Sequence, residues 1–137
     1  MNIAPYLSFD GQCDAAFELY ARVLGGEITM KMHYAEAPMP SDPADAGRVM
    51  HVCLQAGGHE IMGSDRPQHH PGAAKSGMSV AVALPTAEKA HEVFTALAEG
   101  GTVGMPMAAT FWTPAFGMLT DRFGTPWLVS AEGPAPG

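Results

Sequence analysis

One aromatic-rich stretch decides the fold, Thr110-Phe111-Trp112-Thr113-Pro114-Ala115-Phe116-Gly117-Met118-Leu119-Thr120-Asp121-Arg122-Phe123-Gly124-Thr125-Pro126-Trp127. It holds both tryptophans and three of the six phenylalanines of the chain. Two short apolar runs, at 116–119 and 127–129, flank a turn at 121–124. Because Gly124 can adopt a positive φ without steric cost, this turn can be tight. The stretch therefore predicts a β-hairpin.

A helix that ends in two glycines is predicted before this hairpin. Thr86 follows Pro85 and is a suitable N-cap. Gly100-Gly101 closes the helix, because glycine accepts the left-handed conformation common at helix ends. Strands are expected on either side, at 78–84 and from Thr102 onward. The helix has one apolar stripe at three-and-four spacing, formed by Ala90, Val93, Phe94 and Leu97.

The first half of the chain shows the same order of elements. A strand at 6–9, a helix at 12–24 and a strand at 27–34 are followed by a hairpin, 49–55 with 59–62. Gly25-Gly26 ends this helix, 100 − 25 = 75 residues before the second glycine pair. The chain thus repeats strand, helix, glycine pair, strand and hairpin.

Two long loops interrupt the repeat. The segment 35–46 contains three prolines and is expected to be a loop without regular hydrogen bonding, either a lid or a dimer contact. The segment 63–77 is expected to be a second loop that links the two halves.

This order and several motifs resemble the PhnB-like branch of the vicinal-oxygen-chelate superfamily, which includes glyoxalase I, extradiol dioxygenases and bleomycin-resistance proteins. The motifs are Pro5-Tyr6-Leu7-Ser8-Phe9-Asp10-Gly11, Phe17-Glu18-Leu19-Tyr20, Val23-Leu24-Gly25-Gly26, His51 with Ile61-Met62-Gly63-Ser64-Asp65, Ala98-Glu99-Gly100-Gly101-Thr102-Val103, and Met105-Pro106. The resemblance implies an α+β fold of tandem βαβββ modules that form curved half-barrel sheets. It implies one domain at 1–130, with modules at about 1–63 and 77–130 and a flexible tail at 131–137. A small-molecule pocket and a homodimer are also expected from it.

Composition narrows the class of protein. With 47% hydrophobic and 15% charged residues the chain is globular, and no apolar run approaches the roughly 20 residues of a membrane span. A net charge of −7 disfavours nucleic acid and anionic membranes as partners. The opening residues 1–4 do not read as a secretion signal, so a cytoplasmic location is expected. Cys13 and Cys53 are expected to be reduced thiols.

The resemblance also implies positions for a divalent metal, and this sequence fills them poorly. The positions that correspond to the metal ligands of the superfamily are Pro5 or Tyr6, His51, Met78 or Ser79, and Leu128. Only His51 is a credible ligand, whereas a catalytic metal needs about three protein ligands. We therefore expect that these residues do not hold a divalent metal and that the protein has no cofactor. Metal-dependent glyoxalase activity is disfavoured for the same reason.

His51 and Cys53 are the candidate catalytic residues. They stand two apart on a strand, so both point to one face, and Gln55 shares that face. Together they offer a base and a thiol, or two soft metal donors. A pocket histidine beside an inert cysteine is favoured instead, because no carboxylate that would orient the ring lies nearby in the sequence. Gln55 is a candidate hydrogen-bond donor to a ligand.

The remaining polar residues have simpler interpretations. His33 and His91 are expected to be exposed, His59 lies on a turn, and His69-His70 lies in an exposed loop. The Asp121-Arg122 pair can form a turn salt bridge or can present an arginine to an anionic substrate, and the salt bridge is favoured.

Aromatic and methionine side chains form the candidate ligand lining, because they provide an adaptable apolar surface. Phe111 and Trp112 are expected at a pocket mouth. Phe116 and Trp127 lie on paired strands and are expected in the core, although Phe116 also belongs to the candidate lining. The full ligand-binding set is Tyr6, His51, Gln55, Phe111, Trp112 and Phe116.

The leading hypothesis is a metal-independent PhnB-like protein that binds a small apolar or aromatic molecule in a half-barrel pocket, with a sequestration or resistance role. The alternative is a metal-dependent glyoxalase-like lyase or thiol transferase that uses His51. A third hypothesis is a dimeric interaction module. Some family members carry the name of a ubiquinone-pathway methyltransferase, but the sequence has no glycine-rich turn for a nucleoside cofactor.

Overall fold

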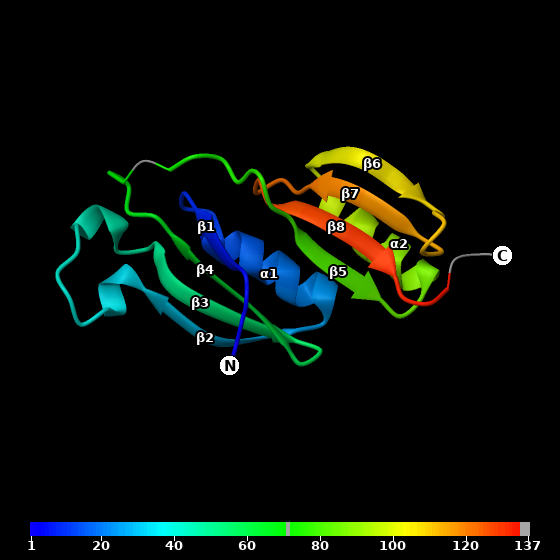
Figure 1. The fold of residues 1–137 in the computed structure, drawn as a ribbon. Coiled ribbons are helices and arrows are strands. Elements are labelled where there is room, and N and C mark those ends of the chain that lie inside the picture. Colours follow the sequence, from blue (N-terminus) through cyan, green and yellow to red (C-terminus); the bar gives the residue numbers. More distant parts are fainter. Residues whose placement is uncertain (71, 135–137) are drawn as a thin grey trace. The chain divides into compact units, whose positions relative to one another are not determined.

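The computed structural model describes residues 1–70 and 72–134. The chain divides into two compact units, unit 1 (Met1–Ala73) and unit 2 (Ala74–Gly137). The boundary falls inside the segment 63–77 that was predicted to link two halves. Each unit contains a four-stranded sheet and a twelve-residue helix (Figure 1).

Unit 1 is a βαβββ module. Its sheet has the order β1-β4-β3-β2, in which β1 and β4 are parallel and the other pairs antiparallel. Its elements are β1 (Tyr6–Phe9), α1 (Cys13–Leu24), β2 (Glu27–His33), the short 3-10 helices η1 (Tyr34–Glu36) and η2 (Pro43–Asp45), β3 (Val49–Ala56) and β4 (His59–Asp65).

Unit 2 repeats this topology. The order of its sheet is β5-β8-β7-β6, and β5 and β8 are the parallel pair. Its elements are β5 (Val80–Leu84), α2 (Ala87–Ala98), β6 (Thr102–Ala108), β7 (Phe116–Thr120) and β8 (Pro126–Ala131). Both sheets are open and curved as half-barrels, so the predicted α+β fold of tandem βαβββ modules is confirmed.

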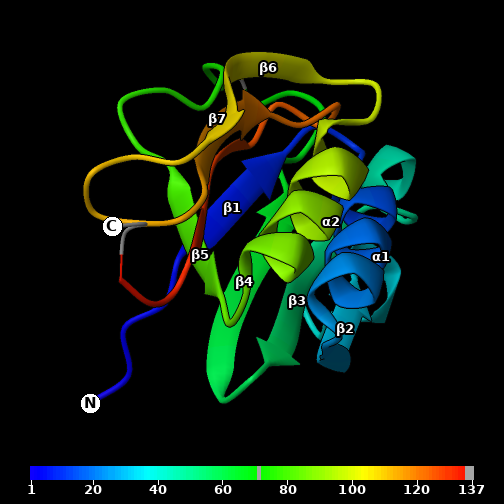
Figure 2. The same cartoon turned by 90° about the vertical axis from the view of Figure 1, so that its right-hand side faces the viewer.

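In each unit the core lies between the helix and one face of the sheet (Figure 2). In unit 1, Phe17 of α1 makes edge contacts with Phe9 and Tyr20 at centroid distances of 6.1 and 5.5 Å. In unit 2, the predicted stripe of α2 is buried, and Trp127 is buried beneath it at 1% exposure. Each such side chain contributes about 1.5–3 kcal/mol when it is fully buried.

The glycine pairs do more than end the helices. Gly25 and Gly100 have φ values of 65° and 76°, in the left-handed region. The second glycine of each pair lies against the backbone of a hairpin strand instead. A Cβ atom on Gly26 would lie 2.6 Å from the carbonyl oxygen of Gln55, and one on Gly101 would overlap the carbonyl oxygen of Thr120. The pairs therefore allow the chain to pass close to β3 and β7.

Three segments differ from the sequence-based prediction. Strand β4 continues to Asp65 in parallel register with β1, although a loop was expected from Gly63. The segment 35–46 contains helical turns from η1 and η2. Strand β8 includes Ala131, the first residue of the expected tail. Residues 135–137 of that tail lie outside the described part of the chain.

Candidate functional site

The sheet of unit 1 leaves one face uncovered by α1. On β3, Val52 and Leu54 are fully buried on the helix side. The alternate residues therefore lie on the opposite face, since side chains alternate along a strand. Cross-strand partners share a face, which adds residues of β1, β2 and β4. We define the open face of unit 1 as Tyr6, Met30, Met32, His51, Cys53, Gln55 and Met62.

Tyr6 and His51 contact each other on this face. The hydroxyl oxygen of Tyr6 lies 3.1 Å from Nδ1 of His51, and the two rings stack with an interplanar angle of 26°. Tyr6 belongs to β1 and His51 to β3, so the contact spans β4. The hydroxyl orients the imidazole, a role for which the sequence offered no nearby carboxylate. Nε2 is the remaining ring nitrogen for a ligand.

Cys53 is a poor nucleophile in this setting. It is 8% exposed, and burial raises the pKa of its thiol; a hydrogen bond with Thr29 opposes this shift and one with Glu60 adds to it. The thiol therefore stays protonated near neutral pH, which disfavours thiolate catalysis. Gln55 is exposed at the edge of the same face, with Glu27 and Glu60 as its strand partners.

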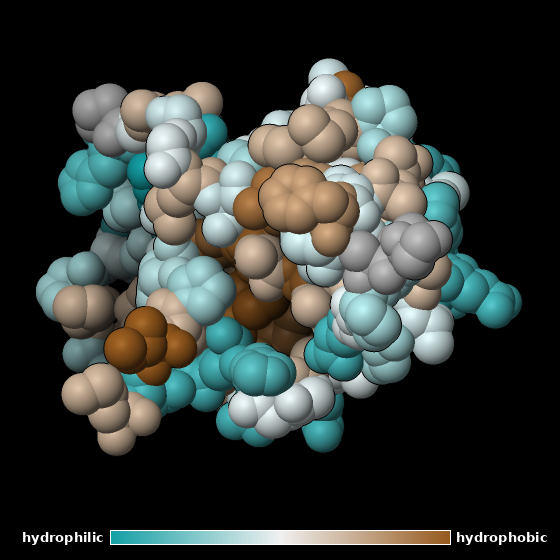
Figure 3. Space-filling model, turned by 45° about the vertical axis from the view of Figure 1, so that its right-hand side comes forward, coloured by the Kyte–Doolittle hydropathy of each residue, from teal (hydrophilic) through white to brown (hydrophobic). Residues whose placement is uncertain are grey.

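The other predicted ligand-binding residues gather in unit 2. Phe111 is 89% and Trp112 52% exposed, and their rings meet edge to face at 4.7 Å. Trp112 also contacts Phe116 at 5.4 Å. Phe116 is half-buried, so the expectation that it lies in the core is wrong, whereas the prediction for Trp127 is confirmed. Apolar side chains are visible at the surface among polar ones in Figure 3.

The structure thus divides the predicted ligand-binding set between two places. Tyr6, His51 and Gln55 share the open face of unit 1. The aromatic cluster of unit 2 consists of Phe111, Trp112 and Phe116.

His33 is not the exposed histidine that was expected. Its Nε2 lies 2.9 Å from Asp14 of α1, and its Nδ1 lies 2.9 Å from Glu36 of η1. The hydrogen bonds to Asp14 and then Glu36 raise the pKa of His33. Both ring nitrogens donate to carboxylates only when the ring is protonated. Protonated His33 therefore connects α1 to the start of the segment 34–48.

Replacing His33 with glutamine is expected to destabilise the protein more at about pH 6 than at about pH 9. Since the folded-state pKa is raised, the stabilisation is complete below the unfolded value of about 6.5 and is lost as pH rises through the folded value. Urea denaturation at both pH values measures the difference. His91→Gln is the control, because His91 is exposed on α2 as predicted. Equal losses of unfolding free energy at the two pH values would contradict a stabilising role for protonated His33.

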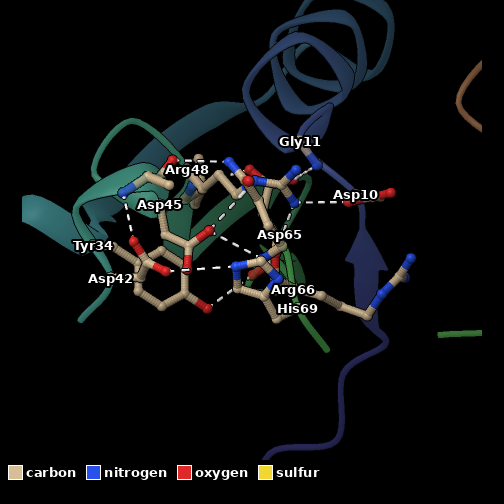
Figure 4. Close-up of polar contacts among 12 residues, drawn as sticks. Asp10, Gly11, Tyr34, Asp42, Asp45, Arg48, Asp65, Arg66 and His69 are labelled. Atoms are coloured by element: carbon tan, nitrogen blue, oxygen red, sulfur yellow. Dashed lines mark hydrogen bonds and ion pairs between the residues drawn. The ribbon is translucent and has the colours of Figure 1, made fainter. Parts of the chain in front are cut away.

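Asp65 is a structural residue whose role the sequence did not reveal. Its Oδ1 accepts hydrogen bonds from the backbone N–H groups of Gly11 and Cys13 at 2.8 and 3.0 Å, and its Oδ2 accepts one from Val49 at 2.9 Å. Figure 4 shows Asp65 at the centre of a polar network. One carboxylate thereby joins the start of α1 to the start of β3.

Arg48 also connects segments of this region. Its Nη1 donates to Oδ1 of Asp10 and to the carbonyl oxygen of Arg66, both at 2.8 Å. In the loop beyond Arg66, Nε2 of His69 lies 3.6 Å from Oδ2 of Asp42 (Figure 4). His69 and His70 are exposed, as expected. These contacts organise the segments 42–48 and 65–69.

The pair Asp121-Arg122 also has a different role from the predicted turn salt bridge. Asp121 is 3% exposed and accepts hydrogen bonds from the backbone of Phe123 and Thr125 and from Nε1 of Trp127. The Arg122 guanidinium lies 4.8 Å from the centre of the Phe123 ring. Asp121 therefore shapes the hairpin turn and fixes the buried tryptophan. His59, expected on a turn, is the first residue of β4.

The divalent metal site that the resemblance implies does not fit these residues. Leu128 and Pro5 have no side-chain donor, and Tyr6 contacts His51 instead. Within residues 1–70 and 72–134, no group of three or more His, Cys, Asp or Glu side chains is arranged to hold a metal ion. In the same described part of the chain, no helix has the length and apolar character needed to cross a membrane.

Comparison with known proteins supports the sequence resemblance. Residues 1–130 match the family model for 3-demethylubiquinone-9 3-methyltransferase. The protein YjdN of Escherichia coli (strain K12) is 32% identical over 95% of both chains. The crystal structure of protein PA1353 from Pseudomonas aeruginosa is 39% identical, with a TM-score of 0.91 over 96% of this chain and 98% of that one.

More distant structures extend the likeness. The PhnB protein from Bacillus cereus is 27% identical, with a TM-score of 0.81 over 96% of this chain and 100% of that one. Two solved structures of glyoxalase-family proteins, at 20% and 13% identity, resemble this chain in fold only. The chain therefore belongs to the family described as 3-demethylubiquinone-9 3-methyltransferase, within the PhnB-like branch of the vicinal-oxygen-chelate superfamily.

Proposed function

We propose that this protein binds a small apolar or aromatic molecule against the open face of unit 1, without a divalent metal. The observation that carries the proposal is the contact between Tyr6 and His51. It places an oriented imidazole beside an aromatic ring, on the face that also carries three methionines, of which Met30 is exposed. Such a surface offers apolar contact together with one fixed polar group, which is the usual composition of a small-molecule site.

Methionine makes this surface suitable for flat ligands. Met30 is 41% exposed, and Met32 and Met62 are half-buried. Thioether side chains are flexible and make favourable contacts with aromatic rings. The ring of Tyr6, itself 46% exposed, offers a stacking surface. We therefore expect a planar ligand with a polar substituent that reaches Nε2 of His51.

We propose the aromatic cluster of unit 2 as a separate apolar binding surface. We further propose a sequestration or resistance role in the cytoplasm and a homodimeric state. A quinone ring of the kind named in the family description falls within the proposed ligand class. Methyl transfer itself is not proposed, because the sequence has no nucleoside-binding turn. The alternative, a metal-dependent lyase or thiol transferase that uses His51, is disfavoured because Pro5 and Leu128 offer no side-chain metal ligand.

Binding of the fluorescent probe 1-anilinonaphthalene-8-sulfonate, followed by a panel of phenols and quinones, tests the proposal. His51→Ala and Tyr6→Ala are each expected to weaken binding about tenfold, because each removes contacts worth roughly 1.4 kcal/mol. Met39→Ala is the control, since Met39 is 60% exposed outside the open face. Wild-type affinity in both site variants, with unchanged thermal unfolding, would contradict the proposal.

Metal analysis of freshly purified protein separates the proposal from the alternative. The proposal predicts zinc, nickel, manganese and iron far below stoichiometric amounts in protein never exposed to a chelator. Stoichiometric divalent metal that is absent from the His51→Ala variant would favour the lyase or thiol transferase instead.

A further inference from the structure

Three sulfur-containing side chains lie in one row across unit 1. The strand register pairs Met30 with Cys53, and Cys53 with Met62. Directly opposite residues have Cβ atoms about 4.5–5.5 Å apart. Both thioethers are therefore within reach of the Cys53 thiol. All three residues belong to the open face, where α1 does not cover them.

An imidazole lies beside this row. The strand partner of His51 is Met32, so the two form the adjacent row on the same face. Nδ1 of His51 contacts Tyr6, which fixes the ring and leaves Nε2 for another partner. Metal-binding histidines commonly have such an outer contact on their second nitrogen.

The chemical type of these donors determines which ions they favour. Thiolate, thioether and imidazole are soft or borderline donors, and sulfur donors favour Cu(I) over hard divalent ions. Met30, at 41% exposure, is the accessible end of the row, whereas Cys53 is buried at 8% exposure.

We propose that Met30, Cys53 and Met62, with His51 beside them, form a binding site for a soft monovalent cation, Cu(I) or Ag(I). Binding replaces the S–H bond of Cys53 with a metal–sulfur bond and releases the proton to solvent. No change of oxidation state is required. This inference goes beyond the proposed function, although the two sites share the open face.

Anaerobic titration of the full chain with Cu(I), in competition with bicinchoninate, tests the site. We expect about one ion per chain in the wild type, with Met30→Leu and Met62→Leu each weakening binding at least about tenfold. Cys53→Ser should weaken it further, because serine cannot supply a thiolate. Met118→Leu is the control, since Met118 is an exposed methionine of β7 in unit 2.

Several outcomes would overturn the site. They are failure of the wild type to compete for Cu(I), wild-type affinity in the three site variants, or equal weakening by Met118→Leu. Thermal unfolding shows whether each variant is folded. Wild-type protein that competes for Cu(I) but does not bind the fluorescent probe would count against the proposed function alone. Wild-type protein that binds the probe but does not compete for Cu(I) would count against the cation site alone.

Discussion

Replacing Asp65 with alanine is expected to lower the free energy of unfolding by about 4 kcal/mol. Three backbone N–H groups, at Gly11, Cys13 and Val49, lose a carboxylate acceptor in this variant. Two of these hydrogen bonds are buried, so water replaces the carboxylate poorly. Urea denaturation followed by circular dichroism measures the loss.

Asp10→Ala is the matched control for this change. Asp10 is an exposed aspartate that contacts Arg48 on the surface of the same network, and exposed ion pairs contribute little. We therefore expect a much smaller loss of stability from Asp10→Ala. Similar losses in the two variants would show that the buried carboxylate does not hold unit 1 together.

Gly101→Ala is expected to lower the free energy of unfolding by about 3 kcal/mol, because the new Cβ would overlap the backbone of β7. The nearest atoms are the carbonyl oxygen of Thr120 and the backbone of Asp121, and neither can move away as a flexible side chain could. Gly26→Ala should have a similar effect in unit 1. Chemical denaturation of each variant provides the measurement.

Gly47→Ala separates this packing effect from a general effect of alanine. A Cβ at Gly47 would meet no other atom within 4 Å. We therefore expect the free energy of unfolding to change by no more than about 0.5 kcal/mol. A neutral Gly101→Ala variant would mean that the turn before β6 and the end of β7 can move apart without loss of stability.

Local patterns in the sequence predicted most of the fold. The apolar stripe of α2 and the strand at 6–9 agree with the structure, because period and capping depend on neighbouring residues. The 75-residue offset between glycine pairs predicted the repeat of βαβββ modules. It did not show that the second glycine of each pair is needed for close packing, since that depends on a distant strand.

Long-range contacts account for the parts that were missed. Asp65 follows Gly63 and Ser64, which favour a loop, and its acceptor role requires Gly11 and Val49 to lie nearby in space. His51 had no visible orienting carboxylate because its partner is the hydroxyl of Tyr6, 45 residues away.

The sulfur row illustrates the same limit. Alternation along a strand places Met30 and Met32 on one face of β2, and His51 and Cys53 on one face of β3. Only the register, with its bulges in β2, sets Met30 opposite Cys53. A pattern within one strand cannot reveal which residue lies across from it.

The central claim is that a ligand binds against the open face of unit 1. Titration of methyl-labelled methionine with 1-anilinonaphthalene-8-sulfonate, followed by NMR, tests it most directly. We predict that the methyl resonances of Met30, Met32 and Met62 shift with a common affinity, while that of Met39 does not. Saturable binding that leaves all three resonances unchanged would contradict the claim.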